Sequence, residues 1–174
     1  MSLDREAFQE TLNDLLFNKD LPLTLNYAKS SALVSESTPS AEMMQTSIGQ
    51  GKTQITPMHL NMITCAIAND GVLMKPYVID RVENDEGTVI KSFEASEYGR
   101  LMSEDEASIL RQLMTDVVQE GTASKLKGLS YTAAGKTGSA EYNNVKGDSH
   151  AWFTGFAPAE DPEVCVTIIV EGAG

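Results

Sequence analysis

The fold is decided by three consecutive stretches near the C-terminus: Ala133-Ala-Gly-Lys-Thr-Gly-Ser-Ala-Glu141, His150-Ala-Trp-Phe-Thr-Gly-Phe-Ala157 and Glu163-Val-Cys-Val-Thr-Ile-Ile-Val170. Each has the length and the residue types of a β-strand. The connections between them, residues 142–149 and 158–162, are short, and short connections favour antiparallel neighbours. We therefore predict a three-stranded antiparallel sheet over residues 131–171.

Three helices are predicted ahead of this sheet. The first covers about residues 4–17, where apolar side chains recur on one face. The second begins with Thr56-Pro57 as N-cap and first helical residue, and ends at Asn69-Asp-Gly71. The third begins at the capping box Ser103-Glu-Asp-Glu106 and has Gly121 at the position of a left-handed C-cap. Together with the sheet, these helices predict an α+β fold.

Between the second and third helices, the sequence predicts a β-hairpin over residues 77–93. Tyr77–Val82 and Thr88–Phe93 flank Asn84-Asp-Glu-Gly87, in which the glycine can adopt a positive φ. The stretch Leu21–Glu42 has no helical or strand period, and we expect an ordered surface connection there. The chain thus divides into a helical part (4–76), the hairpin, a helix over 103–120 and the C-terminal sheet.

The composition is that of one acidic globular chain. Its 174 residues carry 13 Lys and Arg against 25 Asp and Glu, a formal net charge of −12. An acidic surface repels phosphate backbones, so we expect no nucleic-acid partner. Residues 121–150 reverse the balance, with Lys125, Lys127, Lys136 and Lys146 against Glu141 and Asp148. This basic stretch is either a group of solvated lysines or a site for a small anion such as a carboxylate.

No segment of the sequence predicts export or membrane insertion. The longest apolar run, Val164–Val170, is far shorter than the roughly 18 residues of a membrane span. The first residues, Met1–Arg5, have neither the basic nor the apolar region of a signal peptide.

The cysteines and histidines do not predict a metal site or a cofactor. Cys65 and Cys165 form no disulfide framework, and we expect two small buried hydrophobic residues, one on a helix and one on a strand. His59 and His150 are too far apart for a local ligand pair.

The tripeptide Gly-Lys-Thr occurs twice, at Gly51-Lys-Thr53 and Gly135-Lys-Thr137. A phosphate-binding P-loop needs a further glycine five residues before the tripeptide, where this chain has Thr46 and Ser130. Neither copy therefore predicts a nucleotide site.

The second copy also contains Lys136-Thr137-Gly138, the K-T-G triplet of penicillin-recognising serine acyltransferases. The residue types suit that chemistry. The lysine supplies positive potential for a substrate carboxylate and for proton movement near a nucleophile, while the hydroxyls of Thr137 and Ser139 can hydrogen-bond the carboxylate. Gly138 lets a substrate backbone approach the strand closely.

Further motifs surround the triplet in a fixed order: Thr46-Ser-Ile-Gly-Gln-Gly51, Thr56-Pro-Met-His-Leu60, Ala66-Ile-Ala-Asn-Asp-Gly71, Gly121-Thr-Ala123, Ala134-Gly-Lys-Thr-Gly-Ser-Ala-Glu141 and His150-Ala-Trp-Phe-Thr-Gly-Phe-Ala-Pro158. Together they closely resemble the C-terminal half of the transpeptidase domain of class B penicillin-binding proteins. The resemblance extends from about Phe8 to Glu171.

The resemblance implies a partial β-lactamase/transpeptidase-like fold, an antiparallel sheet with helices packed on it. It implies cross-linking of D-Ala-D-Ala stem peptides of peptidoglycan through an acyl-serine intermediate that β-lactams trap, with no cofactor. By the same resemblance the parent protein is anchored in the cytoplasmic membrane, with this domain on its outer face.

The resemblance also assigns the site. Lys136, Thr137, Gly138 and Ser139 would line the active-site strand, and the backbone N–H of Ser139 would be one of two oxyanion-hole donors. His150 and Trp152 begin the neighbouring strand, where they either contact substrate or pack in a core. Glu141 either pairs with Lys136 or faces water.

The sequence departs from the family at the nucleophile. The family requires S-x-x-K and S-x-N upstream of K-T-G. Only Ser124 has a lysine three residues on, Lys127, and we interpret this match as a coincidence; no serine has asparagine two residues on. We interpret Met1-Ser-Leu3 as a vector remnant and residues 4–174 as the C-terminal part of one domain whose N-terminal part is missing.

The absence of these motifs has consequences for activity and association, and it leaves two alternative functions. Without the missing part, we expect the chain to be inactive and to self-associate through an uncovered sheet edge. The alternatives are a non-catalytic binding or scaffolding homologue, and part of a β-lactamase or β-lactam sensor.

Overall fold

The predicted C-terminal sheet is present. The structure, a computed structural model, describes residues 4–142 and 147–173, so the interpretation of Met1–Leu3 lies outside the described residues. The antiparallel strands β5 (Ala134–Glu141), β6 (Ser149–Ala157) and β7 (Val164–Val170) form one sheet in the order β5-β6-β7. The prediction of three antiparallel strands is confirmed.

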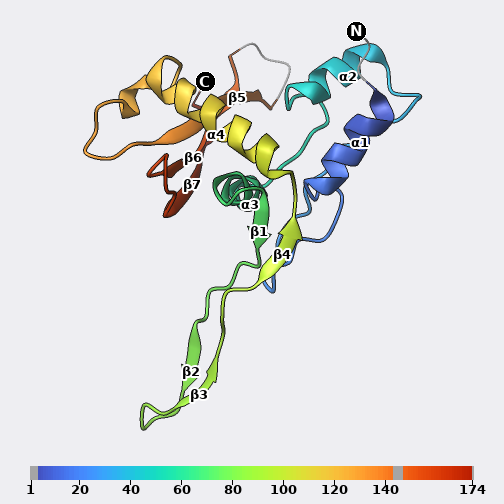
Figure 1. Ribbon diagram of the computed structural model, residues 1–174. Coiled ribbons are helices and arrows are strands. Elements are labelled where there is room, and N and C mark those ends of the chain that lie inside the picture. Colours follow the sequence, from blue (N-terminus) through green and yellow to red (C-terminus); the bar gives the residue numbers. More distant parts are fainter. Residues whose placement is uncertain (1–3, 143–146, 174) are drawn as a thin grey trace.

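Two helices, α3 (Pro57–Ala68) and α4 (Glu104–Gln119), pack on one face of this sheet (Figure 1). The main core cluster joins both helices to the sheet through Ile63 and Ile67 of α3, Met114 of α4, Ala134 of β5 and Phe156 of β6. Helix α1 (Arg5–Asp14) adds Leu12 to the same cluster. The fold is therefore α+β, as expected.

The opposite face of β7 is apolar and exposed. Val164, Val166, Ile168 and Val170 are between 42% and 59% exposed, whereas the alternate residues of β7 are partly buried. Since β5 and β7 are the outer strands, each pairs on one side only in the described sheet.

The helix starts follow the predicted caps. Thr56 Oγ1 accepts from the backbone N–H of His59, and Ser103 and Glu106 form a reciprocal capping box. The predicted left-handed conformation of Gly121 is wrong. The C-cap is Glu120, with φ −134°, and Gly121 is required by space, since a Cβ there would lie 2.8 Å from the carbonyl oxygen of Val117.

Helix α1 is shorter than predicted. It ends at Asp14, and Leu16 has a φ of 68°, a left-handed conformation that is incompatible with a continuing α-helix. The apolar residues after Asp14 thus continue the pattern without continuing the helix. None of the helices in residues 4–142 and 147–173 has the length and apolarity needed to span a bilayer.

The predicted hairpin is an arm that projects from the rest of the molecule (Figure 1). Its strands are β2 (Arg81–Glu83) and β3 (Val89–Ser92), and Gly87 in the turn has the expected positive φ of 78°. At its base, β1 (Val72–Met74) pairs with β4 (Glu97–Arg100). The sequence does not predict β1 and β4, because strands of three and four residues are too short for a period to appear.

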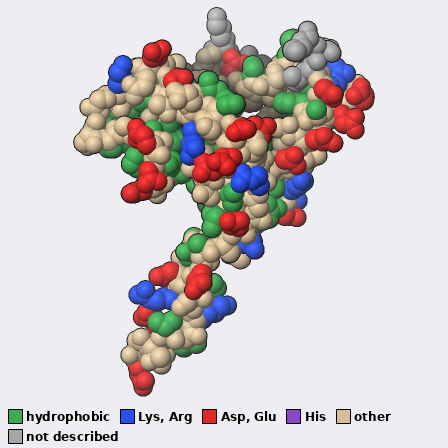
Figure 2. Space-filling view, in the orientation of Figure 1, with side chains coloured by type: hydrophobic (Ala, Val, Ile, Leu, Met, Phe, Trp, Pro, Cys, Tyr) green, Lys and Arg blue, Asp and Glu red, His purple; other side chains and the backbone are tan. Residues whose placement is uncertain are grey.

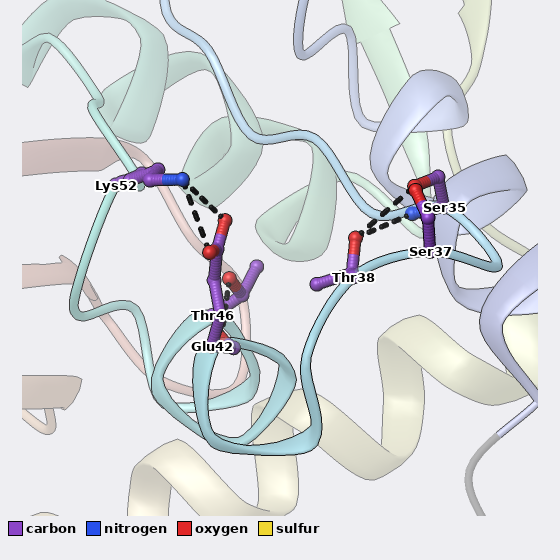
Figure 3. Close-up of polar contacts among 6 residues, drawn as sticks. All are labelled: Ser35, Ser37, Thr38, Glu42, Thr46 and Lys52. Carbon is purple, nitrogen blue, oxygen red and sulfur yellow. Dashed lines mark hydrogen bonds and ion pairs between the residues drawn. The ribbon is translucent and has the colours of Figure 1, made fainter.

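Helix α2 (Ser40–Ser47) also escaped prediction, and overlaps the end of the expected connection. Its N-cap is Pro39, without a side-chain cap. Two polar contacts instead fix its surroundings (Figure 3): Lys52 Nζ lies 2.9 Å from Glu42 Oε1, and the Thr38 hydroxyl accepts from the backbone N–H of Ser35 at 2.9 Å. A helix of eight residues without a side-chain N-cap gives a weak local signal.

Candidate active site

Strand β5 presents the K-T-G residues at the outer edge of the sheet. Lys136, Gly138 and Ser139 are exposed, and Thr137 is partly buried. Lys136 lies opposite Thr154 in the register and Gly138 lies opposite Trp152. Because successive residues of a strand point to opposite faces, Lys136 shares its face with Gly138, and Thr137 shares the other with Ser139.

The ammonium group of Lys136 stays near its own strand. Its Nζ donates to the backbone carbonyl of Thr137. Among the described residues no ion pair joins Lys136 to Glu141, which is exposed and points to the opposite face. No pairing of Glu141 with Lys136 is therefore seen in the described residues, and the role of Glu141 stays a prediction.

Two residues outside the strand hold β5 from its flank. Gln50 Nε2 donates to the carbonyl oxygen of Ser139 at 3.1 Å, and the hydroxyls of Thr122 and Thr137 are 2.5 Å apart. Neither residue is predicted from the sequence to be part of the site. Both lie in segments that carried the family resemblance, 46–51 and 121–123, and that was the available signal.

These contacts fix the direction of the backbone groups of β5. The carbonyls of Thr137 and Ser139 accept from side chains, Lys136 and Gln50. In an antiparallel strand the N–H and C=O of one residue point to the same side, and alternate residues are hydrogen-bonded to the neighbouring strand. The backbone N–H of Ser139 therefore points away from β6, toward the free edge.

A cleft of about 690 Å³ lies beside the far half of β5. It is bounded by Gln50 and by five of the seven candidate residues, namely Gly138, Ser139, Glu141, His150 and Trp152. Lys136 and Thr137 lie outside its lining. Its volume is in the range of small-molecule sites.

His150 and Trp152 are both partly buried in this cleft. The imidazole of His150 stacks on Tyr142, with ring centroids 4.4 Å apart, and its Nδ1 accepts from the backbone N–H of Gly172 at 3.1 Å. These contacts fix His150 at the rim of the cleft, where it both packs and remains accessible. The packing interpretation of His150 therefore has support, and contact of His150 and Trp152 with substrate stays a prediction.

A chain of hydrogen-bonded hydroxyl groups joins α3 to β6 and β7 next to Lys136 in the sheet. Thr64 of α3, Thr154 of β6 and Thr167 of β7 are joined by Oγ1–Oγ1 distances of 2.6 and 2.7 Å. Asn61 Nδ2 continues the chain to Thr167 at 3.3 Å. Since Thr154 is the cross-strand partner of Lys136, this network ties α3 to the part of the sheet that carries the triplet.

The only S-x-x-K match in the sequence lies in the short segment that follows α4. Ser124 opens a short 3-10 helix, η1 (Ser124–Leu126), and Lys127 Nζ donates to the carbonyl oxygen of Gln119 at 3.2 Å. The ammonium group of Lys127 is thus engaged with the end of α4.

The lysines of the basic stretch 121–150 that the structure describes are solvated. Lys125, Lys127 and Lys136 are all exposed, while Lys146 lies outside the described residues. Acidic side chains spread over the face of the body drawn in Figure 2, and both signs alternate along the arm. Within residues 4–142 and 147–173, no group of three or more His, Cys, Asp or Glu is arranged to hold a metal ion.

The comparisons with known proteins agree with one another. The family model for the penicillin binding protein transpeptidase domain matches residues 2–174. The chain is 32% identical over 136 residues to peptidoglycan D,D-transpeptidase PbpA of Mycolicibacterium smegmatis, which covers 77% of this chain and 28% of that protein. It is 29% identical over 143 residues to peptidoglycan D,D-transpeptidase MrdA of Acinetobacter baumannii, covering 75% and 21%.

Solved structures show the same fold. Penicillin-binding protein A from Mycobacterium tuberculosis, as an imipenem acyl-enzyme complex, superposes with a TM-score of 0.87 at 29% identity, over 97% of this chain and 38% of that chain. The D,D-transpeptidase domain of a peptidoglycan glycosyltransferase from Eggerthella lenta gives 0.83 at 30% identity, over 98% and 44%. The chain thus spans less than half the length of these relatives. It belongs to the penicillin-binding protein transpeptidase domain family and resembles its class B members, as the motifs around the K-T-G strand predicted.

Proposed function

We propose that this chain is the K-T-G-bearing part of a peptidoglycan D,D-transpeptidase, and that β5 binds the terminal carboxylate of a D-Ala-D-Ala stem peptide or of a β-lactam. The observation that carries the proposal is the accessible edge of β5, where exposed Lys136 and Ser139 flank Gly138. The reaction is acyl transfer, in which a serine forms an ester with the penultimate D-Ala and releases the terminal one.

The direction of the Ser139 N–H supports a role as oxyanion donor. Gln50 and the β5–β6 register leave this N–H on the free edge, where a substrate strand can lie alongside β5. Such a donor is worth roughly 3 kcal/mol in the transition state, because it meets the negative charge only as that charge develops.

The hydroxyls and the lysine support the carboxylate site. Thr122 orients the hydroxyl of Thr137, and Ser139 places a second hydroxyl on the same face two residues on. Lys136 supplies a positive charge on the same strand, with its side chain on the opposite face of β5 from these hydroxyls. A charged acceptor strengthens each of these hydrogen bonds relative to a neutral one.

We further propose that this chain alone forms no acyl-enzyme. Ser124 is the only serine with a lysine three residues on, and Lys127 is bonded to the end of α4. The acylating serine and the S-x-N hydroxyl would then come from residues outside this sequence, in a parent anchored in the cytoplasmic membrane with the domain on its outer face.

Covalent labelling tests the second statement. We expect fluorescent penicillin to leave no dye on the chain after denaturing electrophoresis, for the wild type and for Ser124→Ala alike. Labelling of the wild type that is lost in Ser124→Ala would show that Ser124 is a nucleophile and would overturn the statement.

Carboxylate binding tests the first. Titration with N-acetyl-D-Ala-D-Ala, followed by ¹⁵N NMR, should shift the amide signals of residues 136–139, and Lys136→Met should weaken binding about tenfold through the loss of a charge-assisted hydrogen bond. Lys125→Met is the matched control, because Lys125 is equally exposed and lies in η1. Equal losses in both variants would contradict a site on β5.

We also propose that the chain self-associates through the outer edge of β7. Four exposed β-branched side chains line one face of this strand, and an unpaired edge is a template for another chain. Sedimentation velocity should show a dimer or a larger species at micromolar concentration, and Ile168→Lys should restore the monomer. A wild type that is monomeric throughout would contradict the proposal.

A further inference from the structure

Two cysteines a hundred residues apart in the sequence lie on elements that pack together, Cys65 on α3 and Cys165 on β7. Helix α3 runs along β7, and Asn61 joins Thr167 across the interface. Four residues along a helix advance about 6 Å, and two residues along a strand advance about 6.6 Å. Cys65 lies about as far from Asn61 along α3 as Cys165 lies from Thr167 along β7, so the contact between Asn61 and Thr167 brings the two cysteines to a similar level.

Each thiol is the largest influence on the pKa of the other, which supports their placement side by side. Cys65 Sγ also lies 3.6 Å from Asn61 Oδ1, to which it donates. Both side chains are partly buried rather than fully buried, which corrects the expectation of two sequestered hydrophobic residues. Cys165 packs at the margin of the main core cluster, so the pair lies at the border of core and solvent.

The proximity of the two thiols makes them unequal. It lowers the pKa of Cys65, because it stabilises the Cys65 thiolate, and burial opposes this effect. The same contact, together with burial, raises the pKa of Cys165. Since the thiolate is the attacking species in thiol–disulfide exchange, Cys65 is the sulfur that reacts first.

We propose that Cys65 and Cys165 form a redox-active thiol pair that closes a disulfide between α3 and β7. The oxidant is a disulfide of a small thiol or of an exchange protein. The Cys65 thiolate attacks one sulfur of this oxidant and expels one thiolate. Cys165 then loses its proton and attacks the Cys65 sulfur of the mixed disulfide, which expels the second. Two protein thiols become one disulfide, and the oxidant leaves as two thiols.

The disulfide would add a covalent link between α3 and β7 beside the network of hydroxyl groups that already joins α3 to the sheet. Asn61 and Thr64 of α3 reach Thr167 and Thr154, and Thr154 lies opposite Lys136. Oxidation therefore fixes α3 against the strands that carry the K-T-G edge, and reduction releases this constraint without removing any side chain of the edge.

The test is equilibration of the full chain in glutathione buffers of increasing oxidising poise, followed by acid quench and alkylation. Mass spectrometry should find two alkylated cysteines in the reduced chain, and none in the oxidised chain, which is lighter by two hydrogens before alkylation. Closing a loop of this length predicts a rise of about 10 °C in the thermal unfolding midpoint relative to the reduced chain.

Cys65→Ser and Cys165→Ser are the matched controls, since each should stop at a mixed disulfide with glutathione and show no such rise. Disulfide-linked dimers, or a wild type that retains two alkylatable thiols in fully oxidising buffer, would overturn the proposal. The wild-type mass measurement stands without the variants, so a variant that fails to fold leaves the test intact.

Discussion

The strand pairs β5–β6 and β2–β3 are both antiparallel, but different kinds of contact stabilise them. In β5–β6, Ala134 is 0% and Phe156 is 3% exposed, and α3 and α4 cover this face of the pair. In β2–β3, every strand residue is exposed. The first pair is held by contacts between residues far apart in the sequence, and the second by contacts within about ten residues.

Local contacts in the arm are nevertheless specific. Asn84 Oδ1 accepts from the backbone N–H groups of Glu86 and Thr88, and Lys91 Nζ lies 4.5 Å from the centroid of the Phe93 ring. A two-stranded hairpin in water is marginally stable at best. We therefore expect the same type of substitution to change the free energy of unfolding strongly in β5–β6 and weakly in the arm.

The largest effect is expected for Phe156→Ala. This side chain is central to the main core cluster, and truncation of a buried phenylalanine costs about 4 kcal/mol in unfolding free energy, because it leaves a cavity. Ile90→Ala in the arm is the matched truncation of a side chain that is 68% exposed, and should change the free energy by less than about 0.5 kcal/mol. Urea denaturation measures both; similar losses would refute the distinction.

Gly155→Ala should follow, with a loss of about 3 kcal/mol. A Cβ at Gly155 would lie 2.4 Å from the carbonyl oxygen of Ala134, so the paired strands must move apart. Gly87→Ala in the arm meets no atom within 4 Å, and costs only the left-handed backbone conformation, about 1 kcal/mol. The same urea denaturation measures both variants, and a larger loss in Gly87→Ala than in Gly155→Ala would contradict the prediction.

The sequence allowed prediction of the elements whose signal is local. The capping box at Ser103, the Thr56-Pro57 helix start and the three C-terminal strands each depend on residues close together in the chain. Helix α2 escaped because it is short and no side-chain cap marks its start, and the end of α1 was misjudged because apolar spacing continues past the left-handed Leu16.

The candidate site shows the same limit. The K-T-G residues could be named from the sequence because their types and order are distinctive. Gln50 could not be given its role, since it reaches Ser139 across 89 residues, and neither could Cys65, whose partner is 100 residues away. Such contacts depend on how α3 and the preceding loop dock onto the sheet, which no local pattern specifies.

A pH effect on stability should come from His59, which is 0% exposed. Its Nε2 lies 2.7 Å from the carbonyl oxygen of Leu15, and its buried Nδ1 has no hydrogen-bond partner among the described atoms. Burial lowers the pKa of His59 below its ordinary value of 6.5, against the opposing effect of the Leu15 carbonyl. The unfolded chain therefore binds this proton first, and stability should fall as the pH drops below 6.5 toward the folded pKa.

Thermal unfolding between pH 7.5 and pH 5.5 measures this effect. The midpoint of the wild type should decrease over this interval, and the decrease should be smaller in His59→Gln, whatever the midpoint of that variant at pH 7.5. His150→Gln is the matched control, because it removes the other histidine of the chain and keeps His59. An equal slope in His59→Gln would assign the pH dependence to other groups.

The smallest global effect is expected for Asn84→Ala, which separates the order of the arm from the order of the body. The substitution leaves two backbone N–H groups of the turn without their side-chain acceptor, so the arm should open more often. Because regions with few buried contacts open independently of global unfolding, the unfolding midpoint should stay within about 1 °C. Hydrogen exchange should accelerate at residues 81–92 and remain unchanged in β5–β6; faster exchange in β5–β6 would mean that the arm and the body unfold as one unit.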